Sequence, residues 1–307
     1  MDIVTLSAEM AQSAAGAAKI VFPLALAAAA LEFLLLRVVK RAPYSMKQAA
    51  LSLLMGAGYA RAAALAGLLW GWLYFLCYEH RLFTLGLGTW WEVLLLFVLV
   101  DFCFYWQHRW AHVTRWGWAS HLQHHSVEQM NMAAPFRLSV TSALSGYQAF
   151  YAPIALIGFH PAAIVVFILI NVSLQVFSHT EAVRKLGWLE GVLNTPSHHR
   201  VHHASNHIYL DKNMSGIFII WDKLFGTFQA ERDDTPTVYG LVHPIDAPPG
   251  PRLLFALWFR EWAWMARDVW RAPGWKARFL YVFGPPGWEP GERLAPARPV
   301  GEIRTAR

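Results

Sequence analysis

Cysteine and charge are both scarce in this chain. Only two of its 307 residues are cysteines, Cys77 and Cys103, which excludes a framework of several disulfides, a thiolate zinc site and an iron–sulfur cluster. Charged residues make up 15% of the chain and hydrophobic residues 56%. This balance argues against an ordinary soluble domain and predicts an integral membrane protein.

The net charge of +6 is carried by residues beside the apolar runs. Examples are Lys40, Arg41 and Lys47, and no basic patch stands apart from these flanks. The sequence therefore predicts no nucleic-acid partner, and basic juxtamembrane loops on the cytoplasmic side of the membrane. The Ala-, Trp- and Arg-rich composition suits a bacterial inner membrane.

Five apolar runs are candidate membrane spans; several are near the roughly twenty residues that a span needs, and the third and fifth are shorter. They are Ala17–Leu36, Ala49–Tyr78, Val93–Trp106, Val140–Phe159 and Ala162–Phe177. The first run has its basic residues after it, so we expect a retained anchor and no signal peptide. We predict an all-α integral membrane protein with about four transmembrane helices plus a hairpin or re-entrant pair around His160.

Three parts of the chain differ in composition. Residues 1–90 are expected to form N-terminal anchor spans, and residues 91–250 a catalytic membrane domain. Residues 251–307 are expected to form an amphipathic helix on the membrane surface, from Leu253 to Trp270, followed by an irregular tail rich in Pro and Gly.

Histidines gather in three clusters in this apolar chain. The clusters are His108-Arg-Trp-Ala-His112, His121-Leu-Gln-His124-His125 and His198-His199-Arg-Val-His202-His203. Because residues i, i+3 and i+4 share one face of a helix, each cluster can direct several imidazoles to one point. Imidazole nitrogen is a ligand for iron, zinc or copper, whereas a lone histidine is more often a hydrogen-bonded core residue. The clustering predicts a metal site.

The number of histidines indicates two metal ions. A structural zinc takes four ligands and a catalytic zinc takes three with water, fewer than the clusters offer. Soluble di-iron bundles use carboxylates in a Glu-x-x-His pattern, which this chain lacks. A nitrogen-rich pair of ions at a membrane surface, without thiolates or a phosphate-binding loop, points to dioxygen activation and attack on a lipid C–H bond.

The clusters must meet at one end of the spans. If the loop after the first span is cytoplasmic, the first two clusters emerge on that side after Trp106, and two further crossings return the third cluster to it. We therefore predict a helical, histidine-rich cap for two metal ions, facing the cytoplasm. His179 is placed to join it, whereas His80, His160 and His243 are expected to be structural.

The sequence motifs that contain the histidine clusters resemble those of the fatty acid hydroxylase and sterol desaturase superfamily. The pattern HxxxH, HxxHH and a later HxxHH carries the resemblance over roughly residues 90 to 290. Five short segments are similar to the corresponding motifs of the branch that includes alkylglycerol monooxygenase. They are His124–Asn131, Asn194–His203, Asp211–Asn213, Ile219–Phe228 and Val282–Trp288.

The resemblance implies a non-haem di-iron centre, dioxygen and external electrons. By this resemblance, nine histidines are the metal ligands and catalytic residues: His108, His112, His121, His124, His125, His179, His199, His202 and His203. His198 is either a further ligand or a supporting residue. No fused electron-transfer segment is evident, so the donor is expected to be a separate protein or a small molecule. Tetrahydrobiopterin is one candidate by resemblance.

A ligating histidine usually donates its other ring N–H to an acceptor nearby. The candidates for this role, or for tuning the site, are Asp101, Glu128, Asn131, Asn194 and Asp211. For each of them a cap or turn role is the alternative, and Asn194 before Thr-Pro is the best candidate for a helix cap.

The sequence predicts a di-iron monooxygenase that hydroxylates or desaturates a lipid and in an ether lipid cleaves the ether. Sterol, hopanoid or carotenoid oxidation is the alternative within the same superfamily. A metal transporter would need ligands near the middle of the bilayer. A zinc-dependent lipid hydrolase would need a general base, for which Glu128 is the candidate.

Overall fold

The computed structural model describes residues 2–40, 43–247 and 250–291. The described residues form helices and connecting loops, with no strand beyond isolated bridges such as Leu85 to Phe159. Four helical segments are long and apolar enough to cross a membrane. The prediction of an all-helical chain with about four membrane-spanning helices is therefore confirmed.

The four candidate spans are Val4–Val39, Met46–Gly67, Trp90–Val113 and Pro161–Ser178. They correspond to α1 (Ile3–Leu34) continued by η1 (Leu35–Val39), α2 (Met46–Glu79), α3 (Trp90–Val113), and α7 (Pro161–Leu174) continued by η5 (Gln175–Ser178). Only 17% of the apolar window of the first span is buried inside the protein. Its exposed apolar surface is what a lipid-facing helix presents.

Polar residues define where these helices begin. The Asp2 side chain accepts from the backbone N–H of Thr5 at the start of α1, and Ser45 does the same for Gln48 at the start of α2. Proline is the first residue of α7 and of α8 (Pro196–His203), where its missing N–H costs nothing. Capping satisfies donors that a bilayer could not.

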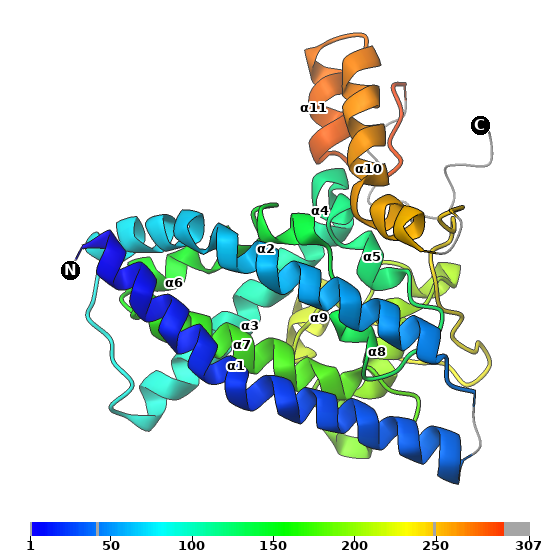
Figure 1. Cartoon of the computed structure of the whole chain (residues 1–307), viewed down its shortest axis with the longest axis horizontal. Coiled ribbons are helices and arrows are strands. Elements are labelled where there is room, and N and C mark those ends of the chain that lie inside the picture. Colours follow the sequence, from blue (N-terminus) through cyan, green and yellow to red (C-terminus); the bar gives the residue numbers. More distant parts are fainter. Residues whose placement is uncertain (1, 41–42, 248–249, 292–307) are drawn as a thin grey trace.

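Helices α1 and α7 end, and α2 begins, toward the same side of the bundle, where α5 (Leu122–His125) and α8 also lie (Figure 1). Both of these short helices carry clustered histidines. At that end Lys40 donates from Nζ to the carbonyl oxygen of Ala182, 3.0 Å away. The Ser45 backbone N–H donates to Gln129, and Gln48 to Glu128. Lys40 and Ser45, on either side of residues 41–42, thus lie at the same end as the histidine clusters.

The segment that returns the chain from the histidine end to the start of α7 is a series of short helices. These are η2 (Ala134–Phe136), η3 (Val140–Ala143), η4 (Tyr147–Tyr151) and α6 (Ala152–Ile157). The apolar run Val140–Phe159 is therefore not one long helix but a series of short ones. Ser139 bonds its neighbouring backbone, Gly146 has a positive φ of 104°, and Pro153 lacks a donor, so regular helix is interrupted. The segment nonetheless leads from the histidine end to the far end, where Leu85 bonds Gly158 and α7 begins, so together with α7 it forms a hairpin with one irregular arm.

The main hydrophobic core lies where the four spans and α6 cross. It includes Leu6, Tyr74, Leu96 and Ile164, all at most 1% exposed. At the far end from the histidines, backbone N–H groups of the loop before α3 donate to the last residues of α6 and to Gly158. Gly158 is required there, because its φ is 138° and a Cβ would lie 2.3 Å from the Phe83 carbonyl oxygen.

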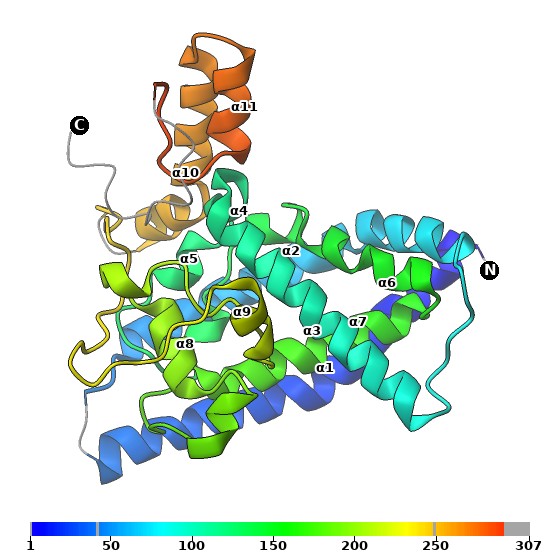
Figure 2. The same ribbon diagram turned by 180° about the vertical axis from the view of Figure 1, so that it is seen from behind.

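Short elements surround the histidines. They are α4 (Arg115–Ala119), α5 (Leu122–His125), η6 (Gly187–Gly191), α8, η7 (His207–Tyr209) and α9 (Ile220–Phe225). Figure 2 shows α8 and α9 beside α3, with the loops after α8 covering them. Elements this short take their places from tertiary contacts, since isolated helices of this length are not stable.

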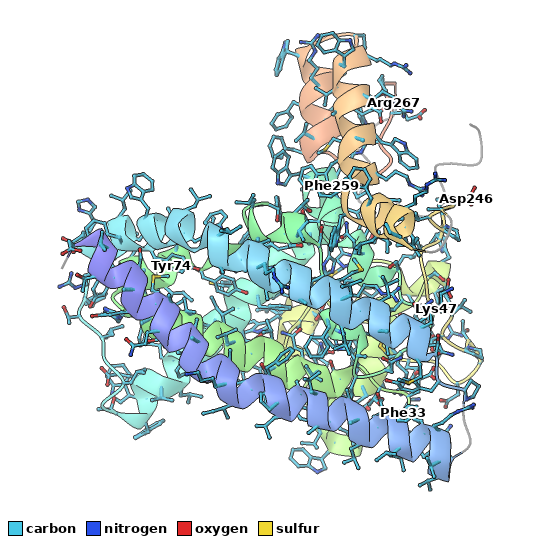
Figure 3. All side chains as sticks on the ribbon, viewed as in Figure 1. Phe33, Lys47, Tyr74, Asp246, Phe259 and Arg267 are labelled. Atoms are coloured by element: carbon cyan, nitrogen blue, oxygen red, sulfur yellow. The ribbon has the colours of Figure 1, made fainter. Side chains whose placement is uncertain are left out.

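The C-terminal hairpin comprises α10 (Pro251–Arg271) and α11 (Trp275–Phe283), and it stands out from the bundle (Figure 1). Arg115, 2% exposed, anchors it by donating to Glu261 over 2.8 Å and to Asp268 over 2.9 Å. In Figure 3 Asp246 lies near the base of α10 and Arg267 further along the hairpin. The structure contains the predicted amphipathic helix, adds α11, and leaves residues 292–307 of the predicted tail outside the described range.

Candidate metal centre

Nine histidines form two groups whose ring nitrogens converge. The first histidine group consists of His108, His112, His121, His125 and His202. The second histidine group consists of His124, His179, His199 and His203. In each group one nitrogen per ring lies within 4.8 Å of all the others, so either group can hold a metal ion.

Helical spacing explains why neighbouring histidines belong to different groups. On α8, His199 and His203 are four residues apart and face the second group, whereas His202 faces the first. At α5, His121 and His125 face the first group and His124 the second. The paired histidines thus connect two centres that lie side by side.

In the first histidine group the Nε2 atoms point inward. Those of His108 and His121 are 3.0 Å apart, and those of His121 and His125 are 3.2 Å apart. The Nε2 atoms of His112 and His202 are buried and have no hydrogen-bond partner among the described residues. Buried nitrogens without partners are costly unless a ligand satisfies them, so this arrangement fits a metal ion.

A single loop orients three rings of the first histidine group. The Nδ1 atom of His108 lies 2.8 Å from the Met214 carbonyl oxygen, and that of His202 lies 2.9 Å from the Lys212 carbonyl oxygen. The Nδ1 atom of His112 lies 3.1 Å from Asp211 Oδ1. With Nδ1–H donated to these oxygens, Nε2 keeps the lone pair that binds a metal.

The backbone of this orienting loop, residues 211–214, is shaped by unusual torsions and buried contacts. Asp211 and Asn213 both have φ of 55°, in the left-handed region, which aspartate and asparagine tolerate better than most residues. Asn213 donates from its amide to the carbonyl oxygens of His198 and Gln229. Asp222 accepts from the backbone N–H of Met214 over 2.7 Å, which fixes the end of the loop.

The second histidine group receives fewer hydrogen bonds from the residues around it. The Nε2 atoms of His199 and His179 are 2.8 Å apart, and those of His203 and His199 are 3.1 Å apart. Only His179 has an Nδ1 partner, the Gln175 carbonyl oxygen at 2.8 Å. The Nδ1 atoms of His124, His199 and His203 are buried without partners in the described part of the chain.

Residues on both sides hold His179 in place. Thr180 Oγ1 donates to the carboxylate of Glu32 on α1, and the backbone N–H of Met132 donates to the same carboxylate over 2.6 Å. Arg200 of α8 donates to the Thr180 carbonyl oxygen and is paired with Glu231. Glu32 is only 3% exposed, and sequence reasoning missed it although a carboxylate in an apolar span is itself a signal.

Burial keeps the histidines neutral. It lowers the pKa of His202 to about 4 and the pKa of His179 to about 3. The pKa values of His124 and His203 lie well below the usual range, first because of burial and then because of neighbouring imidazoles. Neutral imidazole is the form that binds a metal ion.

Of the five predicted supporting residues, Asp211 alone contacts a histidine of either group. Asp101 instead accepts from Asn171, Trp221 and the backbone of residues 217 and 218, which ties α3 to α7 and α9. Glu128 accepts from Gln48 at the surface, away from both groups. Direct orientation of an imidazole is therefore wrong for Asp101 and Glu128.

The two predicted asparagines shape loops. Asn131 Oδ1 accepts from the backbone N–H of Ala133, so this residue forms a turn. Asn194 donates to the carbonyl oxygen of Ser215 and to that of Gly216. Thr195, one residue later, is the N-cap of α8, so the predicted cap at Asn194 is wrong by one position.

Five of the fourteen histidines lie outside the two groups, and one of them, His207, is the first residue of η7. The Nδ1 atom of His198 is 3.2 Å from the Leu193 carbonyl oxygen, and its Nε2 atom is 3.9 Å from Glu190, so the ring faces away from both groups. His160 caps α7 at the far end, and His80 ends α2 there. His243 lines a pocket beside the first histidine group.

The chain is similar to known proteins, and one family model covers the region of the two histidine groups. The family model described as Fatty acid hydroxylase matches residues 93–227, which include all nine grouped histidines. Alkylglycerol monooxygenase of Homo sapiens is 41% identical over 226 residues, covering 73% of this chain and 49% of that protein. The Danio rerio alkylglycerol monooxygenase is 42% identical over 216 residues, covering 70% of this chain and 46% of that protein.

A more distant relative is the ornithine lipid hydroxylase OlsE of Rhizobium tropici, 28% identical over 153 residues, which are 49% of this chain and 45% of that protein. The chain spans about half the length of the curated relatives it matches. No solved structure matches the chain significantly.

Proposed function

We propose that the protein is a membrane-bound monooxygenase that hydroxylates a lipid, because residues 93–227 match the fatty acid hydroxylase family model, as the histidine pattern predicted. The observation that carries the proposal is the convergence of nine imidazoles, eight of them buried, into two adjacent groups at one end of the candidate spans. All nine lie inside the matched region.

Two iron ions are the proposed cofactors, one in each histidine group. The donors are nitrogen only, and their number exceeds what one zinc ion uses. When bound, the iron ions would supply the activation of dioxygen needed to attack an unactivated C–H bond. His108, His112, His121, His125 and His202 would hold the first ion, and His124, His179, His199 and His203 the second.

The protein's own residues hold the centre in place. The loop of residues 211–214 fixes rings of the first group, and Glu32 with Arg200 fixes the segment that carries His179. Hydroxylation of R–H to R–OH by O2 also forms one water, and it consumes two electrons and two protons. We propose an external donor, either a protein or a small molecule such as tetrahydrobiopterin.

The names of the relatives suggest the substrate. They are an alkylglycerol monooxygenase and an ornithine lipid hydroxylase, so both names refer to lipids with polar heads. On an ether lipid, hydroxylation of the carbon beside the ether oxygen gives a hemiacetal, which separates into an aldehyde and an alcohol. Sterol, hopanoid or carotenoid oxidation, or desaturation, is the alternative that the same centre allows.

We propose that the histidine end faces the cytoplasm, in a bacterial inner membrane. Lys40 and Lys47 lie at that end, and basic residues favour the cytoplasmic side. Residues 1–90 would anchor the protein, residues 91–250 would carry the reaction, and α10 would lie on the membrane surface. The exposed aromatic residues Phe255 and Trp270 of α10 suit such a location.

The test is metal content and Mössbauer spectroscopy of protein from iron-replete cells, beside the double variant His124→Ala, His202→Ala. We expect about two irons per chain, lost in the variant, together with O2-dependent conversion of a 1-O-alkylglycerol when reductant is added. One tightly held zinc with anaerobic lipid hydrolysis would overturn the proposal, as would metal uptake into vesicles without O2 consumption.

A further inference from the structure

A pocket lies beside the first histidine group. His112, His125 and His202 of that group line it, together with His203 of the second. We propose that this pocket binds the polar head of an amphiphilic substrate, which rests on the lipid hydroxylase function proposed above. The head-binding residues are then contributed largely by the C-terminal segment.

About half of the pocket wall follows the matched family region, which ends at residue 227. This part of the wall consists of Gly240, Leu241, Val242, His243, Ile245, Arg260, Glu261, Trp264, Pro286 and Gly287. The part of the chain that holds the histidines therefore differs from the part that closes the pocket. A segment outside the matched domain is in place to select the substrate.

The wall combines apolar and polar side chains, as an amphiphile requires. Leu122, Leu241 and Ile245 offer apolar surface, whereas Asp211 and Glu261 offer carboxylates. Each carboxylate already has one partner, His112 for Asp211 and Arg115 for Glu261, but it can accept further hydrogen bonds that a bare hydrocarbon would not supply. A molecule with hydroxyl or amino groups beside a chain matches both kinds of surface.

Two basic side chains of the pocket wall, Arg260 and His243, can contact a polar head. The Arg260 guanidinium lies 4.6 Å from the centre of the Trp264 ring, and it donates to the Asp246 carbonyl oxygen. His243 lines the pocket, and its Nε2 atom is buried without a hydrogen-bond partner among the described residues. A hydroxyl group of a bound head can satisfy that nitrogen in either tautomer, because it both donates and accepts.

The position of the pocket favours a lipid head over a lipid chain. No residue of α1, α2 or α7 lines it, and α3 contributes only His112, one residue before that helix ends. The pocket thus lies beyond the apolar spans, where the head of a bilayer lipid resides. Carbon atoms next to the head would then lie nearest the first histidine group, so oxidation is expected near the head and not at the far end of the chain.

The binding test uses 1-O-octylglycerol as the probe and purified, iron-loaded protein in mild detergent. Affinity is measured by isothermal titration without reductant, so no turnover is needed. The variant His243→Leu keeps an apolar wall but removes the hydrogen bond, and we expect about tenfold weaker binding. The matched control is His80→Leu, an exposed histidine at the far end, which should bind as wild type does.

Iron content and thermal unfolding of both variants are measured first, to show that the variants fold and carry the same metal. Unchanged octylglycerol affinity in His243→Leu overturns the proposal. A raised donor concentration for half-maximal rate, with lipid affinity unchanged, would instead assign the pocket to the electron donor. If weaker binding is found but wild type oxidises no lipid, the pocket assignment stands and the proposed function fails.

Discussion

The first and second histidine groups share two helices but are held in place by different means. Both take ligand candidates from α5 and α8, whereas α3 serves only the first group and the end of η5 only the second. Three Nδ1 atoms of the first group bond oxygens of the loop 211–214, but one Nδ1 atom in the second has a partner. The first group is oriented by a loop, and the second by the packing of helices.

This difference predicts that the groups can be disturbed separately. The loop that orients the first group lies inside the matched family region, and Asp222 holds it. The second group depends on Glu32, which belongs to α1 and precedes that region. Damage to the loop should affect one metal ion, and damage to the α1 contact the other.

The largest expected effect is the loss of one histidine from each group. His202→Ala leaves four candidates in the first group, and His199→Ala leaves three in the second. We expect both variants to lose more than about a hundredfold in activity, because even an outer partner of a ligand is worth about 10–100-fold. We also expect His199→Ala to lose more metal, measured as iron per chain.

His80→Ala is the control for these two variants, because His80 is exposed at the far end of α2. Equal loss of both irons in either variant would show that the two groups form one cooperative unit. The two histidine groups would then not hold their metal ions independently, contrary to the difference described above.

The next effect concerns the orienting loop. Asp211→Ala removes the acceptor of the His112 Nδ1–H, whereas Asp211→Asn keeps an acceptor oxygen. We expect metal affinity in the first group to fall about 10–100-fold in the alanine variant, and by less in the asparagine variant. Competition with a chelator, followed by Mössbauer spectra of each iron site, measures this directly.

Asn131→Ala supplies the comparison for the loop variants, since Asn131 is buried but bonds only a local turn. Loss of iron from the second group in Asp211→Ala, with the first retained, would reverse the assignment of the loop.

A smaller effect is expected from the α1 contact. Glu32→Ala leaves the Met132 N–H and the Thr180 hydroxyl without their acceptor, while Glu32→Gln retains one acceptor oxygen. We expect up to about tenfold weaker metal binding in the second group for alanine, from about 1–3 kcal/mol of lost hydrogen bonding, with partial rescue by glutamine. Iron content and the spectrum of the second site are the readouts.

A loss of thermal stability in Glu32→Ala with unchanged iron sites would make Glu32 merely a structural residue. Ser139→Ala, a buried polar change in the return segment, is the matched control for stability.

The histidine pattern predicted much of this site, because the spacing of histidines in the sequence shows which of them share a helix face. The convergence of distant clusters and the place of His179 both follow from counting crossings of the membrane. The carbonyl oxygens of Lys212 and Met214 could not be found in this way, since every residue has a carbonyl and only the fold directs it. Asp211 could be named as a candidate partner of an imidazole, because its own side chain makes the contact with His112.

The fold was predicted where apolar length decides it and not where local chemistry does. Val140–Phe159 is as apolar as a span, but hydroxyls, Gly146 and Pro153 break it into short helices. A single acid in an apolar run was also ambiguous: Asp101 binds amide and indole donors of neighbouring helices, whereas Glu32 supports the second group. The tertiary partners distinguish the two, and sequence alone does not name them.

The smallest expected effect separates the grouped histidines from their neighbour. His198 precedes His199 directly, but its ring faces Leu193 and Glu190 and contributes to neither group. His198→Gln keeps a polar side chain that can bond the Leu193 carbonyl oxygen, so we expect iron content unchanged and activity within about twofold, as for changes away from the special features of a fold. Iron analysis beside His199→Gln, in which a group member is lost, provides the contrast. Loss of iron in His198→Gln equal to that in His199→Gln would make His198 a tenth ligand, and the two groups would then have equal numbers and no difference in sensitivity to explain.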